Sequence, residues 1–86
     1  MYNIVYSSQA QKDAKKAGKS GLRDNIEKTI EILRINPYQN PPPYEKLIGD
    51  LTGAYSRRIN LQHRLVYQVD ERGKTVKIVR MWTHYE

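Results

Sequence analysis

The segment Asn36-Pro37-Tyr38-Gln39-Asn40-Pro41-Pro42-Pro43-Tyr44 contains all four prolines of this 86-residue chain and separates two halves with different patterns. Proline fixes φ and removes a backbone donor, so the run predicts an extended connector that ends a helix. It is too short to join two domains, because neither half is large enough to bury its own core. Residues 1–86 are therefore expected to form a single domain.

The sequence before the connector begins with a predicted strand and a short helix. Residues 2–7 alternate as a strand does, with larger apolar side chains at every second position. Ser8 and Gln11 match a capping box, in which the hydroxyl accepts from the third helical N–H and the glutamine reaches back. This predicts a helix that begins at Ser8, runs to about Ala17 and is stopped by Gly18.

Helical and strand patterns then follow on either side of the connector. A single apolar stripe predicts a second helix over residues 21–34; it consists of Leu22, Ile26, Ile30 and Leu33. After the connector, alternation predicts strands over 54–61, 64–69 and 75–83, the last two joined by a turn at 70–74. The order predicts an α+β fold, an N-terminal strand and two helices followed by an antiparallel meander, with the helices packed on one sheet face and the other face free.

The composition points to a polyanionic partner. The net charge is +6, from 15 Lys and Arg against 9 Asp and Glu, and the sequence pI is about 9.7. Residues 52–86 carry seven basic and three acidic groups, whereas residues 1–51 carry eight and six. The second part is therefore expected to face an anion, of which nucleic acid is the commonest. A basic pI that serves only solubility is the alternative.

Several classes of protein are excluded by what the sequence lacks. There is no cysteine, so no disulfide framework or thiolate metal site is available. No apolar run approaches the ~18 residues of a membrane span, and the N-terminus does not resemble a signal peptide, so a cytoplasmic protein is expected. The two histidines lack acidic partners at ligand spacing, and no glycine-rich phosphate loop is present, so neither a metal nor another cofactor is expected.

Metal-free RNA cleavage needs only a base, a cation and an acid. The chain offers Glu45 as a base, Arg58 and Arg64 as cations, and His84 as an acid. Each has a plainer interpretation when taken alone. A glutamate beside a lysine is commonly a solvated loop charge, and a histidine near a C-terminus is commonly exposed.

Arg57 and Arg58 are neighbours on a predicted strand, so their side chains point to opposite faces of the sheet. Arg57 shares its parity with Tyr55 and Ile59, so it is expected to be buried and paired or to lie at an edge. Arg58 is therefore the preferred phosphate contact. Arg57 and Lys46 are kept as further candidate RNA contacts.

Three motifs in the second half match a known family. They are G-x-Y-S-R-R-I from Gly53, H-R-L-V-Y from His63, and the closing pair His84-Tyr85. With these motifs the chain resembles the YoeB/Txe toxins of the RelE superfamily. The resemblance implies a microbial-ribonuclease-like α+β fold and an endoribonuclease that cuts messenger RNA at the ribosomal decoding (A) site, which inhibits translation.

The resemblance also implies partners and residue roles. The partners are the ribosome with its messenger, a YefM/Axe-type antitoxin, promoter DNA bound only by the toxin–antitoxin complex, and a second copy in a homodimer. Glu45 matches the family's general base, His84 its general acid and Arg64 the arginine that stabilises the transition state. Arg58 matches a second phosphate contact, and Tyr85 the aromatic residue beside the acid.

The chain departs from the family pattern at three positions. Ile48 stands where the family often has a lysine, a contact that Lys46 can replace. Ala54 stands where a bulky aromatic residue is usual, and Glu86 follows the usual final tyrosine. Two other functions stay open: a basic module that binds RNA or DNA without cutting it, with exposed aromatic rings as stacking platforms, and an inactive relative that only sequesters antitoxin.

Overall fold

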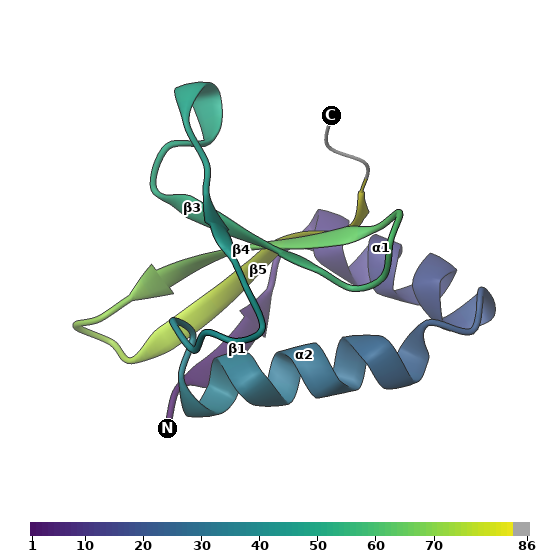
Figure 1. The fold of residues 1–86 in the computed structure, drawn as a ribbon, viewed down its shortest axis with the longest axis horizontal. Coiled ribbons are helices and arrows are strands. Elements are labelled where there is room, and N and C mark those ends of the chain that lie inside the picture. Colours follow the sequence, from purple (N-terminus) through teal and green to yellow (C-terminus); the bar gives the residue numbers. More distant parts are fainter. Residues whose placement is uncertain (84–86) are drawn as a thin grey trace.

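The computed structural model describes the backbone of residues 1–83 and the side chains of residues 1–81, and it contains two helices and a five-stranded sheet (Figure 1). The elements in chain order are β1 (Asn3–Tyr6), α1 (Ser8–Lys19), α2 (Arg23–Ile35), β2 (Glu45–Lys46), the 3-10 turn η1 (Gly49–Leu51), β3 (Ala54–Arg58), β4 (Arg64–Asp70) and β5 (Thr75–Thr83). No helix in this part of the chain is long and apolar enough to cross a membrane.

The sheet has the strand order β1-β5-β4-β3-β2. Strands β2 to β5 form the expected antiparallel meander, and β1 joins the other edge parallel to β5. Both helices lie on the same side of the sheet (Figure 1). The α+β prediction is therefore confirmed, including the single helix-covered face.

One apolar cluster lies between the helices and the sheet. Its buried members come from both helices, from strands β4 and β5, and from the residue that follows β3: Ala10, Ile30, Leu33, Ile59, Leu65, Tyr67, Val76, Ile78 and Met81. The stripe predicted for the second helix supplies two of them, and its other two residues pack partly buried against the same cluster. The sheet's position relative to α2 is therefore determined by this packing.

The start of α1 differs from the prediction by one residue. Ser7, and not Ser8, is the N-cap: its Oγ accepts from the Ala10 backbone N–H at 3.0 Å. The same hydroxyl donates to the carbonyl of Val79 on β5 at 2.7 Å. This tertiary contact selects the first of the two adjacent serines. At the other end, α1 continues through Gly18 to Lys19, so Gly18 does not stop the helix.

Other boundaries also differ from the sequence prediction. Helix α2 is displaced to Arg23–Ile35, and β1 is shorter than predicted. Strand β3 ends at Arg58, three residues early, because the Asn60 side chain accepts from two following backbone N–H groups and starts a turn. The two-residue strand β2 and the turn η1 were not predicted, since neither is long enough to show a periodic pattern.

Strand β5 carries two bulges near its C-terminal end. The register with β4 shifts between Arg64 and Val66 and again between Val66 and Tyr67. The buried carboxylate of Asp13 on α1 accepts from the Met81 backbone N–H at 3.2 Å and from the Arg80 guanidinium at 3.3 Å. Bulges bend the strand that carries them. Asp13 therefore ties the bent end of β5 to the first helix.

A carboxylate far from this end joins three segments of the chain. Glu71, in the turn between β4 and β5, accepts from the Tyr2 hydroxyl at 2.8 Å and from the Tyr38 hydroxyl at 2.5 Å. The ammonium of Lys74 lies 3.5 Å from the same carboxylate. Hydrogen bonds from Tyr38 and Tyr2 lower the pKa of the Glu71 carboxyl below its ordinary value.

Glu71→Gln is expected to reduce the loss of stability at acid pH. Because the folded-state pKa of Glu71 is below the unfolded one, its stabilisation is present above the unfolded pKa and is lost as the pH falls through the folded pKa. Urea unfolding should therefore separate wild type from the variant at about pH 7 and bring them together at about pH 3. A double Tyr2→Phe/Tyr38→Phe variant should show the same reduced pH dependence, and an equal separation at both pH values would contradict the assignment.

Candidate active site

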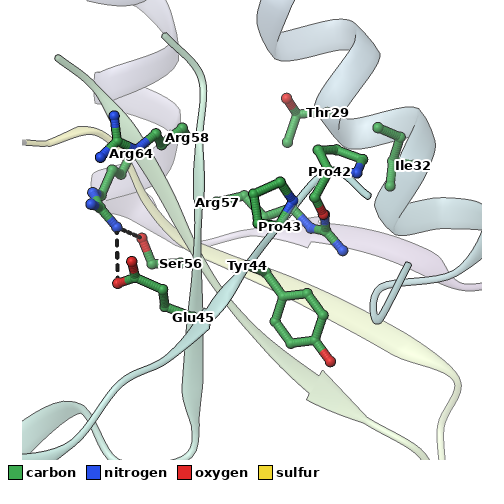
Figure 2. A pocket seen from close by; sticks show the side chains of 10 residues that line it. All are labelled: Thr29, Ile32, Pro42, Pro43, Tyr44, Glu45, Ser56, Arg57, Arg58 and Arg64. Atoms are coloured by element: carbon green, nitrogen blue, oxygen red, sulfur yellow. Dashed lines mark hydrogen bonds and ion pairs between the residues drawn. The ribbon is translucent and has the colours of Figure 1, made fainter. Parts of the chain in front are cut away.

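A cavity of about 180 Å³ lies beside the C-terminal end of β3, between β2, α2 and the proline-rich connector (Figure 2). Charged groups gather at one side of it: Glu45, Arg58 and Arg64. Apolar side chains form the other side, from α2 and from the connector. The cavity therefore combines the candidate base and the candidate cations of the sequence with an apolar wall.

Glu45 and Arg64 meet directly in this cavity. The guanidinium Nη1 of Arg64 lies 3.2 Å from the Glu45 carboxylate and 3.5 Å from the Ser56 hydroxyl (Figure 2). The Arg64 side chain is only 18% exposed, whereas that of Glu45 is 65% exposed. The guanidinium is thus held in place while the carboxylate stays accessible to a ligand.

Local sequence explains why Glu45 lies there. The connector delivers the chain to β2, where Glu45 pairs with Ser56 of β3. The chain then reverses through Gly49 and Gly53, which have φ values of +72° and +98°. Glycine adopts this left-handed region without a steric penalty. A short edge strand therefore holds the carboxylate beside the start of β4, which Arg64 opens.

The two adjacent arginines of β3 have opposite environments, as alternation predicts. Arg58 is exposed, lines the cavity and is the register partner of Arg64. Arg57 is only 2% exposed. Its guanidinium donates to one hydroxyl and three backbone carbonyls of the connector: Tyr67 Oη at 3.2 Å, Pro42 at 2.7 Å, Gln39 at 2.7 Å and Pro37 at 3.1 Å. These donors already bind the connector, although Arg57 also lines the cavity, and its contact with RNA stays a prediction.

Tyrosine rings pack against the buried arginine and the proline-rich connector. The Arg57 guanidinium carbon lies 5.0 Å from the centre of the Tyr44 ring, and Tyr55 packs between Tyr44 and Tyr67. The Tyr67 hydroxyl donates to the Pro37 carbonyl at 2.8 Å. Burial raises the pKa of Tyr67 to about 12, although Arg57 opposes the shift. Tyr67 therefore remains a neutral donor, and the segment that precedes Glu45 is firmly anchored.

The remaining candidates lie outside the cavity or outside the described residues. Lys46 follows Glu45 on β2, so its side chain projects from the opposite face of the sheet. It is exposed and does not line the cavity. Its contact with RNA stays a prediction. His84 and Tyr85 fall outside the described residues. Thr83, the last residue described, is the register partner of Arg64, so β5 ends beside the charged side of the cavity.

Sequence reasoning missed several residues of the cavity. Ser56 has the same parity as Arg58, so strand alternation alone could have placed it on the site face. Thr29 and Ile32 of α2, with Pro42 and Pro43, gave no such signal, because their approach depends on tertiary packing. Within residues 1–83, no three His, Cys, Asp or Glu side chains gather as they would around a metal ion.

Comparison with known proteins agrees with the fold and the sequence motifs. Residues 6–85 match the family described as the YoeB-like toxin of a bacterial type II toxin–antitoxin system. The chain therefore belongs to this family of toxins. The resemblance drawn from the three motifs is confirmed.

Individual relatives support the assignment over most of the chain. Toxin YoeB of Synechocystis sp. is 34% identical over 65 residues, which are 76% of this chain and 73% of that protein. A chain of the heterotetrameric YoeB–YefM toxin–antitoxin complex from Staphylococcus aureus superposes with a TM-score of 0.81 at 36% identity, covering 99% of both chains. The YoeB/ParE toxin from Agrobacterium tumefaciens gives a TM-score of 0.86 at 26% identity, covering 96% of this chain and 99% of that one.

Proposed function

We propose that this toxin is a metal-independent endoribonuclease that cuts messenger RNA in the decoding (A) site of the ribosome and thereby inhibits translation. One observation carries the proposal: the contact of 3.2 Å between the guanidinium of Arg64 and the carboxylate of Glu45, in a cavity beside which β5 ends. A base and a cation at one site are two of the three groups that metal-free RNA transesterification uses, the third being an acid. A module that only held nucleic acid would need the cation alone.

The proposed reaction uses the 2′-hydroxyl of the RNA as its nucleophile. Glu45 accepts the 2′-OH proton, and the 2′-oxygen attacks the adjacent phosphorus while the bond to the 5′-oxygen breaks. Arg64 and Arg58 neutralise charge on the nonbridging oxygens. His84 is the proposed acid that gives a proton to the departing 5′-oxygen, and Tyr85, the next residue in the sequence, is proposed to assist it. The products are a 2′,3′-cyclic phosphate and a 5′-hydroxyl.

We propose that substrate binding weakens the ion pair between Glu45 and Arg64. A phosphate that binds Arg64 offers the guanidinium a second anionic partner and loosens its hold on Glu45. The carboxylate, already 65% exposed, then becomes available to the 2′-hydroxyl. Phosphate binding and activation of the base are coupled in this way.

The proposed partners follow from the charge and from the relatives. A net charge of +6 suits a polyanion such as ribosome-bound messenger. Because that substrate is in the cytoplasm, the proposed activity is cytoplasmic. The Staphylococcus aureus relative forms a complex with YefM and has also been seen as a dimer. We extend these states to this chain as inhibition by a YefM/Axe-type antitoxin and as a homodimer. Promoter DNA is bound only by the toxin–antitoxin complex.

Mapping of new 5′ ends tests this function. Purified protein added to ribosomes stalled on a defined messenger is expected to produce ends at one fixed position within the A-site codon, and prior addition of the antitoxin should prevent them. The same messenger without ribosomes is the control for ribosome dependence. A protein that binds the ribosomes without generating any new ends would contradict the proposal and would favour a non-catalytic binding module.

A further inference from the structure

The apolar side of the cavity is not used by the proposed reaction. Ile32 projects from α2 on this side, opposite Pro42 and Pro43 of the connector, and Thr29 lies one helical turn away (Figure 2). Glu45, Ser56 and the arginines occupy the other side. A ligand that fills the cavity therefore meets charge at one end and apolar surface at the other.

The cavity has room for one planar ring. The volume of the whole cavity, its charged side included, is about 180 Å³, and an apolar cavity of roughly 150 Å³ accommodates a benzene ring. A nucleobase is planar, with apolar faces and a polar edge. The saturated rings of two prolines and a branched aliphatic side chain offer apolar surface to the faces of such a ring.

The walls of this apolar side are fixed by other parts of the protein. The carbonyl of Pro42 accepts from Arg57 at 2.7 Å. The Thr29 side chain is buried, and its hydroxyl donates to the Asn25 carbonyl at 2.9 Å, which leaves its oxygen able to accept from a ligand. A preformed wall binds a ring without paying to order itself.

We infer that the apolar side of this cavity binds one nucleobase of the RNA, that of a nucleotide adjoining the scissile phosphate. The inference rests on the proposed function and adds the subsite that decides which base is accepted there. Arg64 and Ile32 line the same cavity, so one nucleotide can place its phosphate at Arg64 and its base against Ile32. Thr29 and Ser56 are the polar groups placed to contact the edge of the base.

Ile32→Trp tests the subsite through the sequence of the cut sites, because the larger ring fills the cavity. We expect the base preference next to the cut to flatten and the rate to fall about fivefold or more, the loss that corresponds to one base-stacking contact. Ile35→Trp is the matched control, since Ile35 also lies on α2 but is 57% exposed and does not line the cavity. An unchanged base preference in a folded Ile32→Trp protein would overturn the subsite.

A binding experiment separates this inference from the proposed reaction. Dinucleotides with a 2′-deoxy sugar on the 5′ side cannot be cut through the 2′-oxygen, and they can be titrated into wild-type protein by NMR. The methyl signals of Ile32 and Thr29 should shift with these dinucleotides and stay in place with an abasic analogue. Equal shifts with both would overturn the subsite. If the base shifts these signals while ribosomes are not cut, the subsite stands and the proposed function fails.

Discussion

Glu45→Gln is expected to slow cleavage of ribosome-bound messenger by about 10²- to 10⁴-fold, the usual contribution of a positioned general base. Glutamine keeps the size of the side chain and its edge-strand position, but it cannot take the 2′-hydroxyl proton. It also removes the ion pair with Arg64. Because a general base acts in the transition state, the loss should appear in the single-turnover rate more than in ribosome binding. Single-turnover cleavage with ribosomes in excess gives this rate.

Two further variants define what the loss means. Glu27→Gln is the matched control, because Glu27 is an exposed glutamate on α2 that pairs only with exposed Arg23 among the described contacts; it should cut as fast as wild type. Arg64→Lys should cut slowly, because an ammonium cannot form the planar fork that a guanidinium offers to phosphate. Full activity in Glu45→Gln, with a folded protein, would remove Glu45 from the mechanism.

Arg57→Leu is expected to lower the free energy of unfolding by about 3–4 kcal/mol, a large share of the stability of so small a domain. The substitution leaves the carbonyls of Pro42 and Gln39 without their donor, and it removes one donor each from the Tyr67 hydroxyl and from the Pro37 carbonyl, which keeps its bond from Tyr67. Each is wholly or partly buried, and an unsatisfied buried polar group carries its full desolvation cost. Urea denaturation followed by circular dichroism measures the change.

Arg58→Leu is the matched control for this second prediction. It sits on the same strand and loses the same charge, but it is exposed, so its unfolding free energy should change by less than about 0.5 kcal/mol. The two arginines should thus separate cleanly: Arg57 for stability and Arg58 for cleavage. Equal destabilisation by both variants would contradict the burial of Arg57 as the cause.

Much of the fold follows from local pattern. The apolar stripe of α2 and the alternation of residues 75–83 were sufficient, because each element is long enough for its period to show. Alternation along the strand also distinguishes buried Arg57 from exposed Arg58. Local pattern failed where tertiary contacts decide, as at Ser7, which becomes the cap of α1 because its hydroxyl also binds Val79.

The site was accessible from the sequence only in part. Glu45 and Arg64 were named by residue chemistry and by family resemblance, but their separation of 3.2 Å depends on β2, which is two residues long and invisible to periodicity. The apolar side of the cavity depends on α2 approaching the connector, which is long-range packing. The sequence therefore indicates the reacting groups better than it indicates the residues that surround them.

The central claim is that the 2′-hydroxyl of the RNA, activated by Glu45, is the nucleophile. The most direct measurement is the chemistry of the new ends produced on ribosome-bound messenger. We expect a 2′,3′-cyclic phosphate and a 5′-hydroxyl, and no cleavage when the nucleotide 5′ to the cut carries a 2′-deoxy sugar. A 3′-hydroxyl paired with a 5′-phosphate, or undiminished cleavage of the deoxy-substituted messenger, would show that water attacks instead and would contradict the account.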